Sequence, residues 1–195
     1  MGRHLRRAAP AGSLRERVIP VRALLRWAEG ADRAVRLVGE AAAWTGLLMV
    51  LLIAFNVMAR YLFSYGVVGL QEMEWHLLAV GALFGMPYAL NRGEEVRVDV
   101  LYGAFPPRVK LVVDAVGVLC LALASLLIAW LALGFVGQSF RLGEGSADPG
   151  GLPARWLLKA AIPAAFALLA LQALIRFLFD LARLTGHRPT DTAEA

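Results

Sequence analysis

The sequence predicts an all-α integral membrane protein with four transmembrane helices, an N-terminal amphipathic interfacial helix and both termini in the cytoplasm. Three observations support this fold class. The 195 residues are 59% hydrophobic with a mean hydropathy of +0.62, which is too apolar for an ordinary soluble domain of this length. The apolar residues fall into four long runs, and the basic residues are sorted onto alternate connections between these runs.

The N-terminal 40 residues are predicted to form two parts. Residues 1–20 are basic and lack an apolar core, so they predict a disordered tail. Residues 21–40 place apolar and charged side chains on opposite helix faces, which predicts an amphipathic helix lying on membrane lipids. A soluble helical extension is the alternative. The predicted membrane anchors are the basic residues of the polar face and one tryptophan, namely Arg22, Arg26, Trp27, Arg33 and Arg36.

Residues 41–182 are predicted to form the transmembrane domain, and residues 183–195 a cytoplasmic tail. With their flanks, the four apolar runs are long enough to cross a bilayer. The predicted spans are about 41–62, 70–91, 109–140 and 155–180. Gly81 and Gly85 form a G-x-x-x-G pair in the second span, which allows another helix to approach closely. The alternative is the ordinary frequency of small residues in membrane helices.

The distribution of basic residues predicts the orientation. Of the 20 Lys and Arg residues, 16 lie in the N-terminal segment, the 91–110 connection and the C-terminal end. The positive-inside rule therefore places these parts in the cytoplasm and the connections at 61–73 and 141–155 outside. The same sorting argues against a nucleic-acid partner, despite the formal charge of +5.

The sequence contains no catalytic motif, so we do not expect an enzyme. The three histidines, His4, His76 and His187, are too few and too scattered for a paired haem site or a zinc site. The single cysteine, Cys120, cannot form an intrachain disulfide. No cofactor and no metal are expected.

A charged cluster near the outer end of the first two spans is the candidate site. Arg60 can reach Glu72 or Glu74 across a short loop, and a bidentate pair would clamp the first span to the second. A solvated interfacial cluster is one alternative, and an ion or substrate site is another. The last is disfavoured because no acid lies at mid-membrane, where coupling sites of transporters are found.

Several dispersed motifs resemble the small membrane subunit of the tripartite ATP-independent periplasmic (TRAP) transporters. They lie at span ends and in the two longer connections, and they cover residues 41–180. The motifs are Asn56 with Arg60-Tyr61-Leu62-Phe63, Leu70-Gln71-Glu72 with Trp75-His76-Leu77, Val96-Arg97-Val98-Asp99 followed by Pro107-Arg108, and Gly143-Glu144-Gly145-Ser146 with Pro149-Gly150-Gly151-Leu152-Pro153-Ala154-Arg155-Trp156. One departure is Glu95, where the family often has histidine before Val-Arg-Val-Asp.

The resemblance implies a non-catalytic scaffold subunit of the bacterial inner membrane. Its implied partners are a large permease subunit, which would hold the substrate and sodium sites, and a periplasmic solute-binding protein that delivers an organic acid or similar solute. The structural residues that it implies are Arg60 and Glu72 in the clamp, Arg97 and Asp99 in the cytoplasmic interface, and Arg155, Trp156 and Lys159 at the outer end of the fourth span. The alternative is a stand-alone four-helix scaffold or assembly factor without transport activity.

Overall fold

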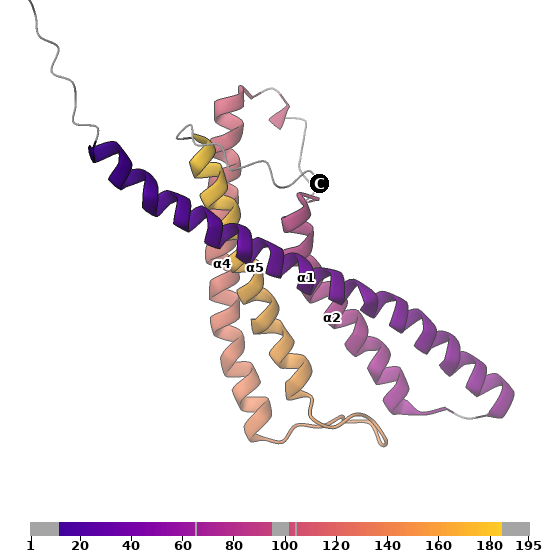
Figure 1. Ribbon diagram of the computed structural model, residues 1–195. Helices are drawn as coiled ribbons and strands as arrows, with labels where there is room; N and C mark the ends of the chain where they lie inside the picture. The colour runs from indigo at the N-terminus through magenta and orange to yellow at the C-terminus, as the bar shows by residue number, and fades with distance from the viewer. Residues whose placement is uncertain (1–11, 65, 95–101, 104, 185–195) are drawn as a thin grey trace, which may run out of the picture.

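The computed structural model describes residues 12–64, 66–94, 102–103 and 105–184, with side chains from Trp27 onward. In these ranges the chain forms helices α1 (Gly12–Phe63), α2 (Val68–Arg92), α4 (Pro107–Arg141) and α5 (Trp156–Leu184) (Figure 1). No strand occurs in the described ranges. The all-helical class predicted from the sequence is therefore confirmed.

Helix α1 is a single helix of 52 residues. The boundary predicted between an interfacial helix (21–40) and the first span is absent, and helix replaces the predicted disordered tail over residues 12–20. No proline interrupts residues 21–63, and an isolated glycine inside a helix costs only about 1 kcal/mol relative to alanine. Nothing in the local sequence therefore forces the helix to break where the hydropathy changes.

The apolar face of the first part of α1 packs against the protein itself. Ala28 and Val35 are fully buried, and Asp32, between them, forms hydrogen bonds to α2 and α5. On the other side, Trp27 is 60% exposed and Arg33 is also exposed. From Trp27 onward, where side chains are described, this second side is exposed.

The other three helices lie close to their predicted spans. Helix α2 begins two residues before the predicted span 70–91 and ends one residue after it. Helix α4 exceeds the predicted span 109–140 by the same amounts. Helix α5 begins one residue after the start of 155–180 and ends four residues later. Gly93 ends α2 in the left-handed conformation with φ of 70°, a backbone region that glycine adopts without strain.

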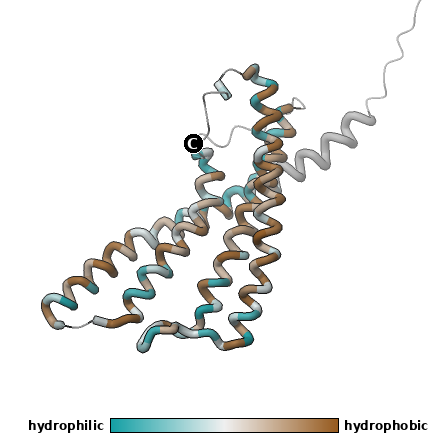
Figure 2. Tube along the Cα trace, turned by 180° about the vertical axis from the view of Figure 1, so that it is seen from behind, coloured by the Kyte–Doolittle hydropathy of each residue, from teal (hydrophilic) through white to brown (hydrophobic). Residues whose placement is uncertain are grey.

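Three helices of the described chain are long and apolar enough to cross a membrane, over Trp27–Phe63, Pro107–Arg141 and Trp156–Leu184. Helix α2, with 25 residues, is not among them. Its first turns contain Gln71, Glu72, Glu74 and His76, which lower its mean hydropathy. Figure 2 shows apolar residues along all the helices, and hydrophilic residues in the 142–155 connection, at helix ends and at scattered positions within the helices.

The helices form two hairpins, α1 with α2 and α4 with α5, joined by packing of α2 along α5. The hairpins splay apart toward their connected ends, and α1 crosses α5 nearer the opposite end (Figure 1). The two hairpin connections therefore lie at one end of the bundle. The starts of α1 and α4 and the ends of α2 and α5 lie at the other end.

The core between α2, α4 and α5 is formed by Leu90, Ala122, Leu169 and Ala173. Its alanines allow the helix backbones to approach closely, as in membrane helix packing. By contrast, many large apolar side chains are exposed, including Trp130 at 69%. Soluble monomers rarely expose apolar surface on this scale, so the outer faces are suited to lipid or to partner helices.

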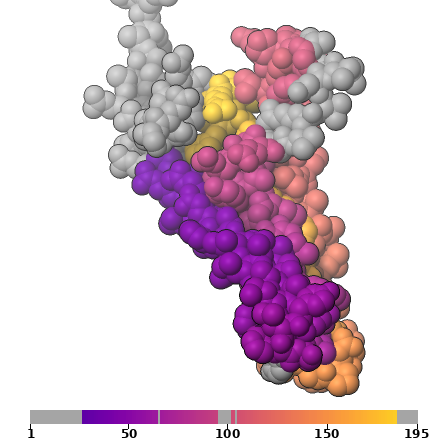
Figure 3. All heavy atoms as spheres, turned by 90° about the vertical axis from the view of Figure 1, so that its right-hand side faces the viewer, coloured from indigo at the N-terminus to yellow at the C-terminus, as the bar shows by residue number. Residues whose placement is uncertain are grey.

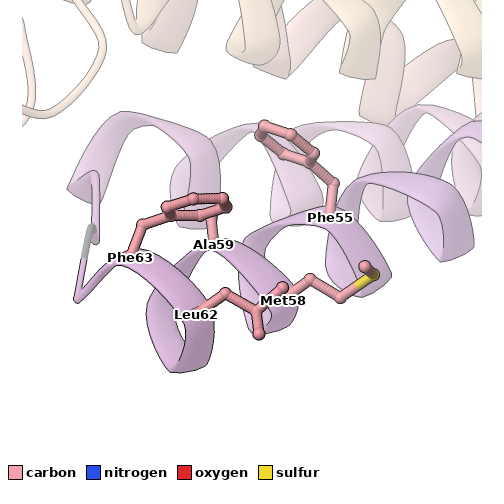
Figure 4. Close-up of a pocket in the computed structure, with 5 residues that line it drawn as sticks. All are labelled: Phe55, Met58, Ala59, Leu62 and Phe63. Atoms are coloured by element: carbon pink, nitrogen blue, oxygen red, sulfur yellow. The ribbon is translucent and has the colours of Figure 1, made fainter.

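An apolar groove lies along the last turns of α1, at the end of the first hairpin. It encloses about 360 Å³ and is lined by five residues of this one helix, Phe55, Met58, Ala59, Leu62 and Phe63 (Figure 4). In Figure 3 the same end of α1 is foremost, with the orange 142–155 connection beside it at the bottom. All of these side chains except Ala59 are exposed.

Candidate functional site

The 142–155 connection folds back on itself through backbone hydrogen bonds. The N–H of Ser146 donates to the carbonyl oxygen of Leu152 at 3.0 Å, and the N–H of Arg155 donates to that of Glu144 at 2.9 Å. Gly150 has a φ of 81°, so the turn between these pairs uses a conformation that favours glycine. The connection is therefore a formed loop with a defined shape.

This loop holds the carboxylate of Glu72, which lies in the first turns of α2. Glu72 accepts hydrogen bonds from the Ser146 hydroxyl and, at 2.6 Å, from the backbone N–H of Leu152. The guanidinium of Arg155 lies 3.6 Å from the same carboxylate. Glu72 is only 7% exposed, so two hydrogen-bond donors and a neighbouring guanidinium compensate a buried charge. We call Glu72, Ser146, Leu152 and Arg155 the outer latch.

Two glycines let the loop approach α2 this closely. A Cβ placed on Gly151 would lie 2.5 Å from the Cβ of Ser146 and 2.8 Å from a carboxylate oxygen of Glu72. A Cβ on Gly69 would lie 3.2 Å from the carbonyl oxygen of Gly150. The latch therefore depends on the absence of side chains at positions 69 and 151.

A second ion pair joins the loop to the first turn of α5. The Lys159 ammonium donates to a carboxylate oxygen of Glu144 at 2.5 Å and lies 4.1 Å from the centroid of the Phe135 ring. This hydrogen bond holds the pKa of the Glu144 carboxyl below its usual value of 4.5. Trp156, beside them, packs edge-to-face against Phe140 with ring centroids 5.2 Å apart.

A cavity of about 210 Å³ opens between α2 and α5 next to the latch. It is lined by Glu72, Trp75, His76, Arg155, Leu158 and Lys159. Nδ1 of His76 lies 2.7 Å from the backbone carbonyl oxygen of Glu72. Because a carbonyl oxygen only accepts, Nδ1 carries the proton, and Nε2 is the nitrogen left for other contacts.

Helices α1 and α2 are joined by polar and close contacts. The Asn56 amide donates to Glu74 at 3.0 Å, and Asn56 is 5% exposed. A Cβ placed on Gly81 would lie 2.6 Å from the hydroxyl oxygen of Thr45, so the two helices are close at this point. A Cβ on Gly85 would meet no atom within 4 Å. Of the predicted packing pair, only Gly81 contacts another helix of the described chain.

A second polar junction lies at the opposite end of the bundle. The Asp32 carboxylate of α1 accepts hydrogen bonds from the amides of Asn91 at 2.7 Å and Gln172 at 2.8 Å. Nearby, the Arg176 guanidinium donates to the carbonyl oxygen of Leu90 at 3.2 Å. We call Asp32, Asn91 and Gln172 the inner junction. It joins α1, α2 and α5, and the sequence did not predict it.

The predicted clamp needs correction. In the described part of the chain, Arg60 forms no ion pair with Glu72 or Glu74 and its side chain is exposed. Glu72 instead contacts Arg155, and Glu74 contacts Asn56. Folding of the 142–155 loop brings Arg155 to Glu72, although it lies much farther along the chain than Arg60.

The remaining predicted residues divide by location. Arg155, Trp156 and Lys159 gather at the outer latch and its neighbouring ion pair, whereas Arg97 and Asp99 lie outside the described residues. Of the predicted anchors, Arg33 and Trp27 are exposed and Arg36 is half-buried. The backbones of Arg22 and Arg26 belong to α1, and their side chains lie outside the described set.

The chemistry available at the latch is electrostatic. Within the described ranges, no three His, Cys, Asp or Glu side chains come together in a group that could hold a metal ion. The outer latch combines a buried carboxylate with hydroxyl and amide donors and a neighbouring guanidinium, an arrangement that fixes one segment against another. It joins the loop between α4 and α5 to the start of α2, and so connects the two hairpins at their splayed ends.

Residues 49–183 match a family model described as tripartite ATP-independent periplasmic transporters, DctQ component. The matched segment covers more than half of the chain and contains every residue of the outer latch. It begins after Asp32, so the inner junction connects the matched segment to residues upstream of it. No curated protein and no solved structure matches this chain.

Proposed function

The chain belongs to the DctQ family, the small permease component of tripartite ATP-independent periplasmic transporters, and on this premise we propose that it is a non-catalytic scaffold subunit. The transporter would be sodium-coupled and import an organic acid or similar small solute. The chain would pair with a large permease subunit, and a periplasmic solute-binding protein would deliver the solute. The substrate and sodium sites would lie on the large subunit.

One observation carries the scaffold role, namely the polar latch between the two hairpins. A moving part would be expected to leave its charged groups free to exchange partners, whereas Glu72 is only 7% exposed, accepts two hydrogen bonds and lies beside the Arg155 guanidinium. The large exposed side chains are instead apolar, for example Trp130 on α4. A rigid body with an apolar outside suits a subunit that widens the static part of a transporter.

We further propose that α2 is a fourth span. Its polar first turns would then lie at the outer membrane boundary, where the loop supplies donors for Glu72. The uneven distribution of Lys and Arg supports cytoplasmic termini in a bacterial inner membrane. The hairpin connections share one end of the bundle, as this orientation requires (Figure 1). Arg97 and Asp99 would then face the cytoplasm.

The test is affinity purification of the tagged full chain from its native membrane in mild detergent, followed by mass identification of co-eluting proteins. A stoichiometric large permease subunit is the expected result. The chain eluting alone, from cells shown to express that permease, would favour a stand-alone membrane scaffold. If a chain with reversed charges at Glu72 and Arg155 retains the permease equally well, assembly with the permease does not depend on the latch.

A further inference from the structure

The cavity between α2 and α5 contains more hydrogen-bond donors than acceptors. The contact between Arg155 and Glu72 is 3.6 Å, which is too long for a hydrogen bond, and the Arg155 side chain is 39% exposed. An arginine side chain has five N–H donors, so most of those on Arg155 remain available. The ammonium of Lys159 has three donors and uses one on Glu144.

The carboxylate acceptors beside the cavity are already occupied, which leaves Nε2 of His76 as its free acceptor. One carboxylate oxygen of Glu72 accepts from Ser146, and the other accepts from Leu152. Glu144 accepts from Lys159 and does not line the cavity. A ligand that satisfies the free donors must therefore supply acceptor oxygens. Each cation already lies beside one carboxylate, and its remaining N–H groups form their strongest hydrogen bonds to an oxyanion.

The surroundings indicate where such an anion comes from. Trp75 lines the cavity and is 71% exposed, and aromatic residues of this kind are typical of the membrane–water boundary. Leu78, one turn farther along α2, is 58% exposed and extends the apolar surface toward the membrane interior. A ligand with an oxyanion beside a long apolar tail matches both features.

We propose that this cavity binds the phosphate of a phospholipid headgroup at the outer membrane boundary, with Arg155 and Lys159 as donors and Trp75 against the headgroup. The volume of 210 Å³ lies below the range of about 300–1,000 Å³ for drug-sized ligands, so it suits a single headgroup. The acyl chains lie along the exposed face of α2. This site is separate from the transport role and requires only that the chain spans a membrane.

Native mass spectrometry of the full chain, purified with any subunit that accompanies it and then delipidated, tests the proposal. Dioleoylphosphatidylglycerol is added back to the wild-type chain and to the Lys159→Gln, Trp75→Ala and Arg60→Gln variants. We expect one tightly retained lipid, with apparent affinity roughly tenfold weaker after Lys159→Gln, because one charge-assisted contact is lost. Trp75→Ala weakens it without removing any hydrogen bond of the described protein.

Arg60→Gln is the matched control, because it removes a charge at the same end of the bundle outside the cavity. It is expected to retain the lipid as the wild type does. Equal weakening in this control would show a general charge effect and overturn the proposal.

Two further probes separate the lipid from its parts. Retention of dioleoylglycerol, which lacks phosphate, to the same extent would refute the headgroup assignment, and displacement by millimolar inorganic phosphate would indicate a soluble oxyanion as the ligand instead.

Discussion

The carboxylate of Glu72 accepts a 2.6 Å hydrogen bond from the backbone N–H of Leu152, 80 residues farther along the chain. This bond ties the start of α2 to the loop before α5, at the end where the two hairpins splay apart. With the Ser146 hydroxyl and the Arg155 guanidinium, it completes the outer latch.

Replacing Glu72 by Gln should loosen the loop without unfolding the helices. The amide keeps the size of the carboxylate but loses its charge, and one of its two terminal atoms becomes a donor facing donors. Amide hydrogen exchange at Leu152 should become faster by on the order of tenfold, because a charge-assisted bond is replaced by a weak one. Glu40→Gln, at an exposed site on α1, is the control. Unchanged protection at Leu152 would mean that the loop holds its shape without the latch.

Substituting alanine at Gly151 should destabilise the protein, whereas the same change at Gly145 should not. The new methyl group at position 151 would lie 2.8 Å from the Glu72 carboxylate and closer still to Ser146, so the loop must move. Overpacking of this kind typically costs about 1–3 kcal/mol. Position 145 has open space around it. The midpoints of denaturant unfolding in detergent should separate the two variants, and equal midpoints would contradict the close approach.

Helices α2, α4 and α5 lie close to the spans predicted from the sequence because their signal is local, whereas the division of α1 into tail, interfacial helix and span was not observed. The long apolar runs locate the ends of these three helices within a few residues. The partner of Glu72 depends on how a Gly- and Pro-rich loop folds, which no periodicity encodes. Arg60 was predicted as the partner of Glu72 because it is close in the sequence, whereas the folded loop brings Arg155 to Glu72 instead. The inner junction had a weak signal, since a glutamine inside an apolar span needs a buried partner, yet nothing in the sequence named Asp32.

Alanine at Gly81 should weaken the packing of α1 on α2, while alanine at Gly85 should leave it intact. The added Cβ would lie 2.6 Å from the Thr45 hydroxyl oxygen at the first site and in open space at the second. We expect a loss of about 1–3 kcal/mol for Gly81→Ala. Adding Thr45→Ala removes the clashing oxygen and should recover part of this loss. A double-mutant cycle on unfolding free energies measures the coupling, and strict additivity would contradict the contact.

Replacing Asp32 by Ala should release the first part of α1 from the bundle. The amides of Asn91 and Gln172 would each lose an acceptor, and Gln172 is 2% exposed, so water cannot easily replace it. Leaving a buried donor without a partner costs about 1–3 kcal/mol. Hydrogen exchange should accelerate over residues 27–40 and stay unchanged in α4. Acceleration throughout the protein would instead indicate that Asp32 supports the whole fold.

Lowering the pH should remove the ion pair between Glu144 and Lys159, because it protonates the Glu144 carboxyl, whose pKa is lowered in the folded protein. Its pKa lies below 4.5 in the folded protein because Lys159 donates to the charged form. The stabilisation is therefore fully present above about pH 4.5, the value expected in the unfolded chain, and is lost as the pH falls through the lower folded value.

Removing the ammonium by Lys159→Gln should lower the melting temperature at pH 7. The difference from the wild type should shrink as the pH falls below 4.5, because protonated Glu144 no longer gains from the ammonium. Arg141→Gln, an exposed change at the end of α4, should show no such convergence. A difference between wild type and Lys159→Gln that stays constant down to pH 3 would mean that Lys159 stabilises the protein through its contact with Phe135 and not through the carboxylate.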